Sequence, residues 1–181
     1  MNNKLYWFEI HITVDYQQKD KFVEFCEKSG IKIIDIDMDV MSDIMTSIKV
    51  FCTADEAIQL ANIKAIWFAF EGFSIERIKV EAEKSYPGDF LYIESHLKFV
   101  GKLTNKIEKT NLISKNRKNP TYHLITFREN KLFDIFEASI YNKIQELESF
   151  GLCLVDKIEI EKVIFDSNPE HDTNWLNLNK R

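Results

Sequence analysis

Two segments of the chain alternate polar and apolar residues in the same way. Residues 8–14 read Phe-Glu-Ile-His-Ile-Thr-Val, and residues 93–99 read Ile-Glu-Ser-His-Leu-Lys-Phe. Successive side chains of a β-strand point to opposite faces of the sheet, so each segment is predicted to be a strand that carries Glu, His and Thr or Lys on one face. The repeat indicates a duplicated fold with a shared polar surface.

The same periodicities predict the other elements of a first half, residues 1–86. Sequences typical of helix N-termini begin at Asp15 and at Thr53, and Gly30 and Gly72 follow the ends of the two helices. The order strand, helix, strand, strand, helix, strand is that of a ferredoxin-like unit. The strands are expected over residues 5–14, 31–37, 45–51 and 73–83.

A second half is predicted over residues 90–181, after the turn Tyr-Pro-Gly-Asp at 86–89. A helix with an apolar stripe is expected between Asn130 and Gly151. The basic segment 101–120 is interpreted as a solvated loop with a short helix near 103–109, or as a basic flap over a phosphate-bearing ligand. The strands are expected over residues 91–100, 122–128 and 152–165.

These elements predict a single globular α+β unit made of two ferredoxin-like halves with antiparallel sheets. At Gly30, Gly72 and Gly151 a helix is followed by glycine and an apolar strand, which favours duplication of a βαβ-type unit. The sheets would face each other across a shared polar cleft or close into a barrel with a polar interior. The sequence leaves both arrangements open.

The polar faces of four predicted strands hold the candidate site residues. A solvent-facing sheet also explains alternation, but such faces usually mix Thr, Lys and Glu without repeated histidines. Cations and imidazoles on a concave face fit a phosphorylated or carboxylated ligand, with carboxylates orienting the cations or ribose hydroxyls. The candidates are Glu9, His11, Thr13, Arg77, Lys79, Glu81, Glu94, His96, Lys98, Thr126 and Arg128.

The composition of the chain argues against some classes of binding partner. A net charge of −5 and a pI near 5.5 argue against a protein that binds duplex nucleic acid. No apolar run reaches the length of a membrane span, and the N-terminal sequence lacks the features of a signal peptide. Three scattered cysteines favour reduced, core-packed thiols. We therefore expect a cytoplasmic monomer or homodimer that does not bind membranes.

A metal site is an alternative interpretation of the polar faces. His11 and His96 with Glu81 and Glu94 (or Glu9) could form a site of two histidines and a carboxylate. The neighbouring cations would repel a metal ion, so phosphate is preferred to metal, and no metal or cofactor is expected. His171 lies in a polar C-terminal segment and is expected to be exposed.

Two resemblances involve the same residues. His11-Ile12-Thr13 and His96-Leu97-Lys98 resemble the paired His-x-Thr/Ser strands of 2H phosphoesterases, although Lys98 stands where that family has a hydroxyl. The chain also resembles an uncharacterised bacterial family, which implies no activity. The shared strings are Met45-Thr46-Ser47, Gly72 with Arg77-x-Lys79-x-Glu81, Tyr92-x-Glu94-x-His96-x-Lys98, Thr126-x-Arg128, and Phe165-Asp166-Ser167-Asn168 followed by Trp175.

The sequence therefore predicts a protein that binds a phosphorylated small molecule, a nucleotide or an RNA end. The 2H resemblance implies cyclic phosphodiesterase chemistry in which His11 and His96 share the acid and base roles. Thr13, Lys79, Lys98 and Arg128 would then hold the phosphate. A binding or sensor module without catalysis and a metal-dependent enzyme remain the alternatives.

Overall fold

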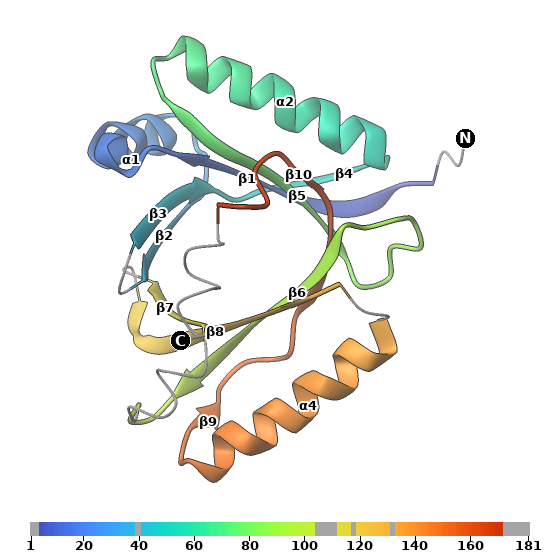
Figure 1. The fold of residues 1–181 in the computed structure, drawn as a ribbon. Coiled ribbons are helices and arrows are strands. Elements are labelled where there is room, and N and C mark those ends of the chain that lie inside the picture. Colours follow the sequence, from blue (N-terminus) through green and yellow to red (C-terminus); the bar gives the residue numbers. More distant parts are fainter. Residues whose placement is uncertain (1–3, 39–40, 104–111, 117–118, 131–132, 172–181) are drawn as a thin grey trace.

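The computed structural model describes residues 4–38, 41–103, 112–116, 119–130 and 133–171 (Figure 1). These residues form an α+β protein with an antiparallel sheet, as the sequence predicts. The sheet lies between helices (Figure 1). Among these residues, no helix combines the length and the apolar character needed to cross a lipid bilayer. The expected helix near 103–109 and Trp175 fall largely or wholly outside the described ranges.

The first half begins with β1 and ends with β5. Its two α-helices pack on the same face of the sheet, where Figure 1 shows them together on the outer side of the strands. Thr53 forms the predicted capping box with Glu56 at the start of the second helix. The elements are β1 (Tyr6–Val14), a short 3-10 turn (Tyr16–Gln18), α1 (Lys19–Lys28), β2 (Ile33–Met38), β3 (Met41–Thr46), β4 (Ile48–Cys52), α2 (Ala54–Phe70) and β5 (Ile75–Glu83).

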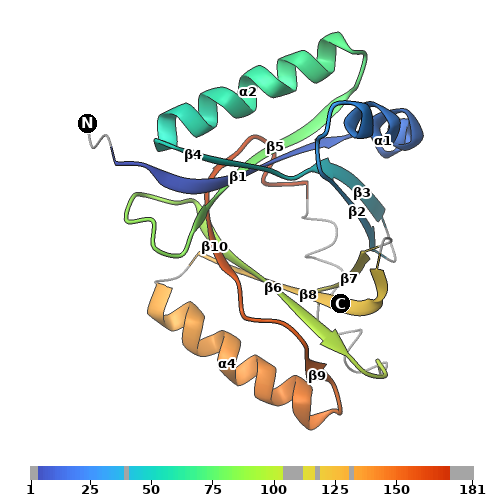
Figure 2. The same ribbon diagram turned by 180° about the vertical axis from the view of Figure 1, so that it is seen from behind.

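The second half places a single described α-helix on the opposite side of the molecule, as the reverse view in Figure 2 also shows. Phe136, Ile140, Ile144 and Leu147 of this helix form the predicted apolar stripe and are buried against the sheet. The elements are β6 (Tyr92–Val100), β7 (Leu112–Asn116), β8 (Asn119–Glu129), α4 (Phe133–Ser149), β9 (Cys153–Leu154) and β10 (Ile160–Asp166).

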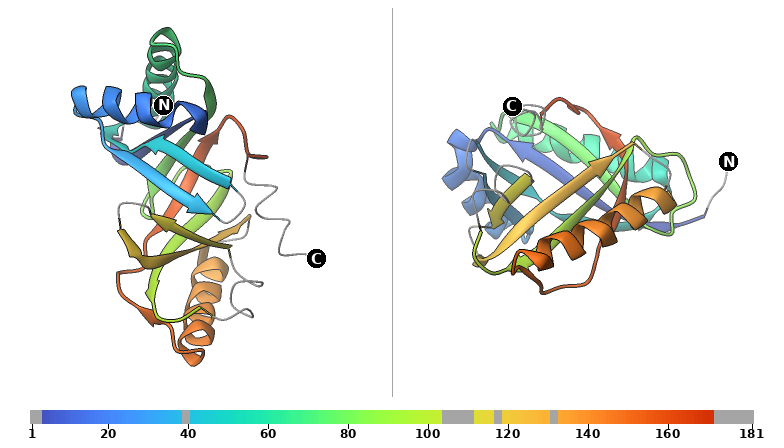
Figure 3. Two further views of the ribbon diagram at one scale, coloured as in Figure 1. Left: turned by 90° about the vertical axis from the view of Figure 1, so that its left-hand side faces the viewer. Right: turned by 60° about the horizontal axis from the view of Figure 1, so that its bottom comes forward.

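The strands of the two halves have the same order of neighbours. In the first half the order is β5-β1-β3-β2, and in the second half it is β10-β6-β8-β7. Two pairings join the halves: β2 pairs with β7, and β10 pairs with β5 as well as with β6. Strands from both halves therefore curve around a common centre in Figures 1 and 2, and Figure 3 shows them between α1 and α2 on one side and α4 on the other.

Two apolar cores lie between the strands and the helices that cover them. In the first half Ile10, Ile12 and Val80 pack with residues of α1 and α2, and in the second half Ile93 and Leu97 pack with α4. Because side chains alternate along a strand, the residues between these apolar positions point to the other side of the sheet. The polar faces of both halves therefore point away from the helices.

The observed strands differ from the prediction in three places. Residues 45–51 are split at Ser47 into β3 and β4, because Thr46 Oγ1 accepts a hydrogen bond from the backbone of Ile12 and Ser47 N donates to Lys32 O. Residues 152–165 are split into β9 and β10 around the turn at Asp156, whose carboxylate accepts from the next amide. Strand β7 lies in the basic segment, where the sequence predicted a loop.

Candidate functional site

Seven of the candidate residues are buried on the side of the sheet that faces away from the helices. The alternative of a solvent-facing sheet does not hold for them, because a polar surface in water would leave such side chains exposed. We call this group the polar cluster: His11, Thr13, Arg77, Lys79, Glu81, Glu94 and Thr126. Glu9, His96 and Arg128 are partly buried beside it.

His11 is held between two acceptors. Its Nδ1 donates to the carbonyl oxygen of Thr46 at 2.9 Å, and its Nε2 lies 2.8 Å from Glu81 Oε2. A carbonyl oxygen only accepts, and an ionised carboxylate also only accepts. Both ring nitrogens of His11 therefore face oxygen atoms that accept hydrogen bonds, which fixes the orientation of the ring. The split between β3 and β4 places the Thr46 carbonyl opposite this ring.

Lys79 connects the two halves of the protein. Its Nζ lies 2.6 Å from Glu81 Oε1 on the same strand and 2.8 Å from Glu94 Oε2 on β6. Burial by itself would lower the pKa of Lys79, but the two carboxylates outweigh this effect and raise it. The ammonium group stays charged, and it joins residues that lie in different halves of the sequence.

The same balance keeps both carboxylates ionised. Burial favours the neutral acid, but Lys79 and Arg128 lower the pKa of Glu94 to about 2. Lys79 and His11 likewise hold the pKa of Glu81 well below its usual range, against the effect of burial. Arg128 donates to Glu94 Oε1, so Glu94 is bound by two cations.

His96 and Lys98 have the most exposed side chains among the candidate residues on this side of the sheet. The Nδ1 atom of His96 is 2.9 Å from Thr126 Oγ1, and its Nε2 is 3.8 Å from Glu94 Oε2. About 40% of the His96 side chain is exposed. Loss of hydration around the ring lowers the pKa of His96, and the nearby carboxylate of Glu94 offsets only part of that effect. Near neutral pH this imidazole is uncharged and able to accept a proton.

Both repeated histidines approach one carboxylate. His11 Nε2 contacts Glu81 directly, and one nitrogen of His96 lies within 4.8 Å of an oxygen of the same Glu81. Both imidazoles also lower the pKa of Glu81. The two strands that share the Glu-x-His pattern therefore present their histidines to the same region of the protein.

The remaining candidates lie at the margins of the cluster. Glu9 accepts from Ser47 Oγ and lies 3.5 Å from Lys49 Nζ. Thr13 is buried opposite Arg77 in the β1–β5 pairing. Lys98 points to the connection between β9 and β10, where its Nζ lies 2.6 Å from Asp156 Oδ2.

Two residues that were not selected from the strand faces bind Arg77. Asp166 accepts from Arg77 Nε at 3.0 Å and from Nη2 at 2.7 Å, in a bidentate pair. Tyr92 accepts from Nη2 and donates to Asp166. In the sequence, both residues lie in the strings quoted above for a resemblance, Tyr92-x-Glu94 and Phe165-Asp166, and those strings are the only sequence signal that pointed to them.

Glu161 of β10 is a further acidic group that sequence analysis missed. It lies opposite Glu94 in the β10–β6 pairing. The negative charge of Glu81, together with burial, raises the pKa of Glu161 to about 9. This residue therefore keeps its proton at neutral pH and adds no negative charge beside Glu81 and Glu94. The predicted unbroken strand gave no reason to assign it to the polar face.

The positive charge of Lys79 would repel a metal ion bound at the centre of the polar cluster. Glu81, Glu94 and His96 offer ligand atoms within 4.8 Å of one another. The ammonium group of Lys79 already lies against both carboxylates. A divalent cation would have to displace this buried ammonium, so the arrangement disfavours a metal ion at this position.

Comparison with known proteins gives no match to a family model, to a curated protein or to a solved structure. The class of this protein is thus defined by its own structure: an α+β protein with an antiparallel sheet and a buried polar cluster contributed by both of its halves.

Proposed function

We propose that the polar cluster and its partly exposed neighbours bind a phosphorylated small molecule, a nucleotide or an RNA end. The observation that carries the proposal is the convergence of His11 and His96 on Glu81, beside three cations from β5 and β8. Buried arginine–carboxylate pairs hold guanidinium groups in fixed directions, which prepares them to recognise a phosphate.

The phosphate would approach from the side where His96 and Lys98 are open to solvent. Lys98 has 43% of its side chain exposed and is paired with the exposed Asp156. Exposed ion pairs contribute little to stability, so a phosphate can replace Asp156 at small cost. Lys79 and Glu94, in contrast, form a buried pair that would orient Arg128 and His96 rather than contact the ligand.

The convergence of the two histidines and the lowered pKa of His96 favour a cyclic phosphodiesterase of the 2H kind. The uncharged His96 would take a proton from water, whose oxygen forms a new bond to phosphorus. The bond from phosphorus to one ribose oxygen would break, and His11 would give that oxygen a proton. This assignment also fits the equal strand order of the halves, which we attribute to duplication of a ferredoxin-like unit around a shared polar interior.

Turnover of a 2′,3′-cyclic nucleotide tests the proposal. We expect hydrolysis by the wild-type protein, measured by phosphorus NMR, and a decrease of about 10²–10⁴-fold in His96→Gln, because a lost proton-transfer group costs that much. His11→Gln should decrease turnover similarly. His123→Gln is the matched control, since His123 bonds to Gly101 O. Equal turnover in His96→Gln and wild type would reject the catalytic role.

A non-catalytic binding module is the second candidate. It is favoured by the contacts of His11, whose ring nitrogens are both engaged by Thr46 and Glu81. Under this proposal the cyclic nucleotide raises the melting temperature of the wild-type protein without forming product. The absence of both product and stabilisation would reject phosphate binding itself. For both candidate functions we propose that the protein acts on a phosphorylated partner. We also propose that it is a monomer or homodimer located in the cytoplasm.

A further inference from the structure

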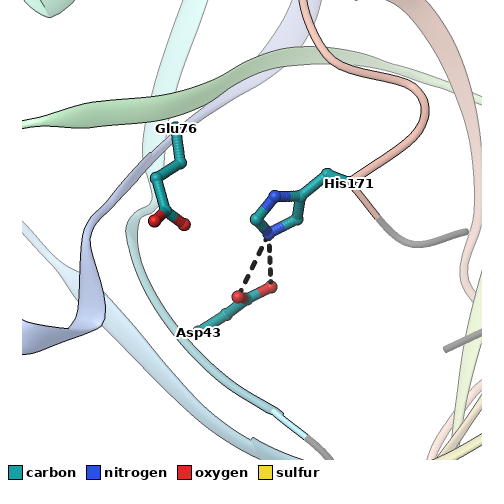
Figure 4. Close-up of side chains that lie close together, drawn as sticks. All are labelled: Asp43, Glu76 and His171. Carbon is teal, nitrogen blue, oxygen red and sulfur yellow. Dashed lines mark hydrogen bonds and ion pairs between the residues drawn. The ribbon is translucent and has the colours of Figure 1, made fainter. Parts of the chain in front are cut away.

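A second group of ligand-type side chains lies outside the polar cluster. Asp43 of β3, Glu76 of β5 and His171 after β10 come together from three distant parts of the chain (Figure 4). One atom from each lies within 4.8 Å of the others. His171 Nε2 is 3.2 Å from Asp43 Oδ1 and 3.3 Å from Oδ2. The predicted exposure of His171 is wrong, since only 9% of its side chain is exposed.

The chain after β10 is fixed to β5 in a way that positions His171. Ser167 N donates to Ile78 O, and Ser167 Oγ accepts from Ile78 N at 2.8 Å. Asn168 Nδ2 donates to the carbonyl oxygen of Glu76, and His171 N donates to Asn168 O. These bonds tie the imidazole to the strand that carries Glu76. The backbone thus brings the nitrogen ligand to the two carboxylates.

The carboxylates of this group repel each other. Asp43 is only 5% exposed. Partial burial raises the pKa of Glu76, His171 opposes this effect, and Asp15 and Asp43 add to it. Two carboxylates beside one imidazole form a group of ligand-type atoms that a divalent cation would fit. No lysine or arginine contact to Asp43 or Glu76 is present among the described residues, in contrast to the Lys79 contacts of the polar cluster.

We propose that Asp43, Glu76 and His171 bind a divalent transition-metal ion of the Zn²⁺ class. An imidazole nitrogen with carboxylate oxygens suits Zn²⁺ and its neighbours in the first transition row, whereas Mg²⁺ and Ca²⁺ prefer oxygen ligands alone. Three protein ligands leave at least one coordination position for water or for another ligand. Glu76, the most exposed of the three, lies where such a ligand would enter.

Zn²⁺ titration of the intact, chelator-treated protein tests this site. We expect saturable binding by calorimetry at pH 7.5, with a Kd at or below about 10 μM, and no comparable heat with Mg²⁺. His171→Ala and Glu76→Gln should each weaken Zn²⁺ binding by at least about tenfold, because each removes a ligand. Glu76 is exposed, so its variant is expected to fold, and circular dichroism will check this.

Matched variants separate this site from other histidines and acids. Glu71→Gln changes an exposed acid in the turn after α2, and His96→Gln removes the histidine of the other possible cluster. Both variants should bind Zn²⁺ as the wild-type protein does. Absence of saturable Zn²⁺ binding, unchanged affinity in His171→Ala, or loss of binding only in His96→Gln would each overturn the proposal. If saturable Zn²⁺ binding is absent, the contact between His171 and Asp43 is an ion pair and no metal site.

Discussion

Replacing Lys79 by methionine is expected to lower the free energy of unfolding by about 3–5 kcal/mol, because it leaves a buried carboxylate without its cation. Glu81 and Glu94 both contact the ammonium group at less than 3 Å and are almost fully buried. Methionine fills a similar volume, so the loss reports charge rather than packing. Urea denaturation at pH 7 followed by fluorescence or circular dichroism measures it.

The exposed pair Lys28–Glu24 on α1 supplies the control for this experiment. Its two side chains are 73% and 67% exposed, and they lie one helical turn apart. Lys28→Met should change stability by no more than about 0.5 kcal/mol. A loss of less than about 1 kcal/mol in Lys79→Met would contradict the role given to Lys79. The double variant Lys79→Met, Glu81→Gln should recover part of the loss, since it also removes one of the unpaired charges.

Glu161→Gln is expected to stabilise the protein at alkaline pH by roughly 2–4 kcal/mol and to have little effect near pH 5. In the unfolded chain a glutamate ionises near pH 4.3. In the folded protein the pKa of Glu161 is about 9, mainly because of Glu81. Between these values the folded state binds more protons than the unfolded state, so this residue makes stability fall as the pH rises. Glutamine resembles the protonated acid and removes that loss.

Denaturation curves at pH 5, 7 and 9 measure this difference. Glu159→Gln is the matched control, because Glu159 is an exposed acid that precedes β10 and pairs with Lys157. Its stability should follow that of the wild-type protein at each pH. Parallel pH dependences of Glu161→Gln and wild type would show that Glu161 ionises normally in the folded protein.

Local sequence patterns determined most of the elements and the two faces of the strands. Alternation placed His11 and His96 on polar faces opposite buried isoleucine and leucine, and the capping box at Thr53 fixed the start of α2. These features depend on residues a few positions apart, where side-chain periodicity and capping act directly. They were sufficient to assign an α+β class and to select seven residues that are buried together.

Only the tertiary structure decided which of these groups meet and which charges they carry. Lys79 contacts Glu94 because β10 pairs with both β5 and β6, and no local pattern encodes such a pairing. The raised pKa of Glu161 arises from charges on other strands. His171 reaches Asp43 because the chain after β10 is bonded to β5. Contacts between distant segments depend on packing of the whole chain, and that packing is the physical reason the sequence alone left them open.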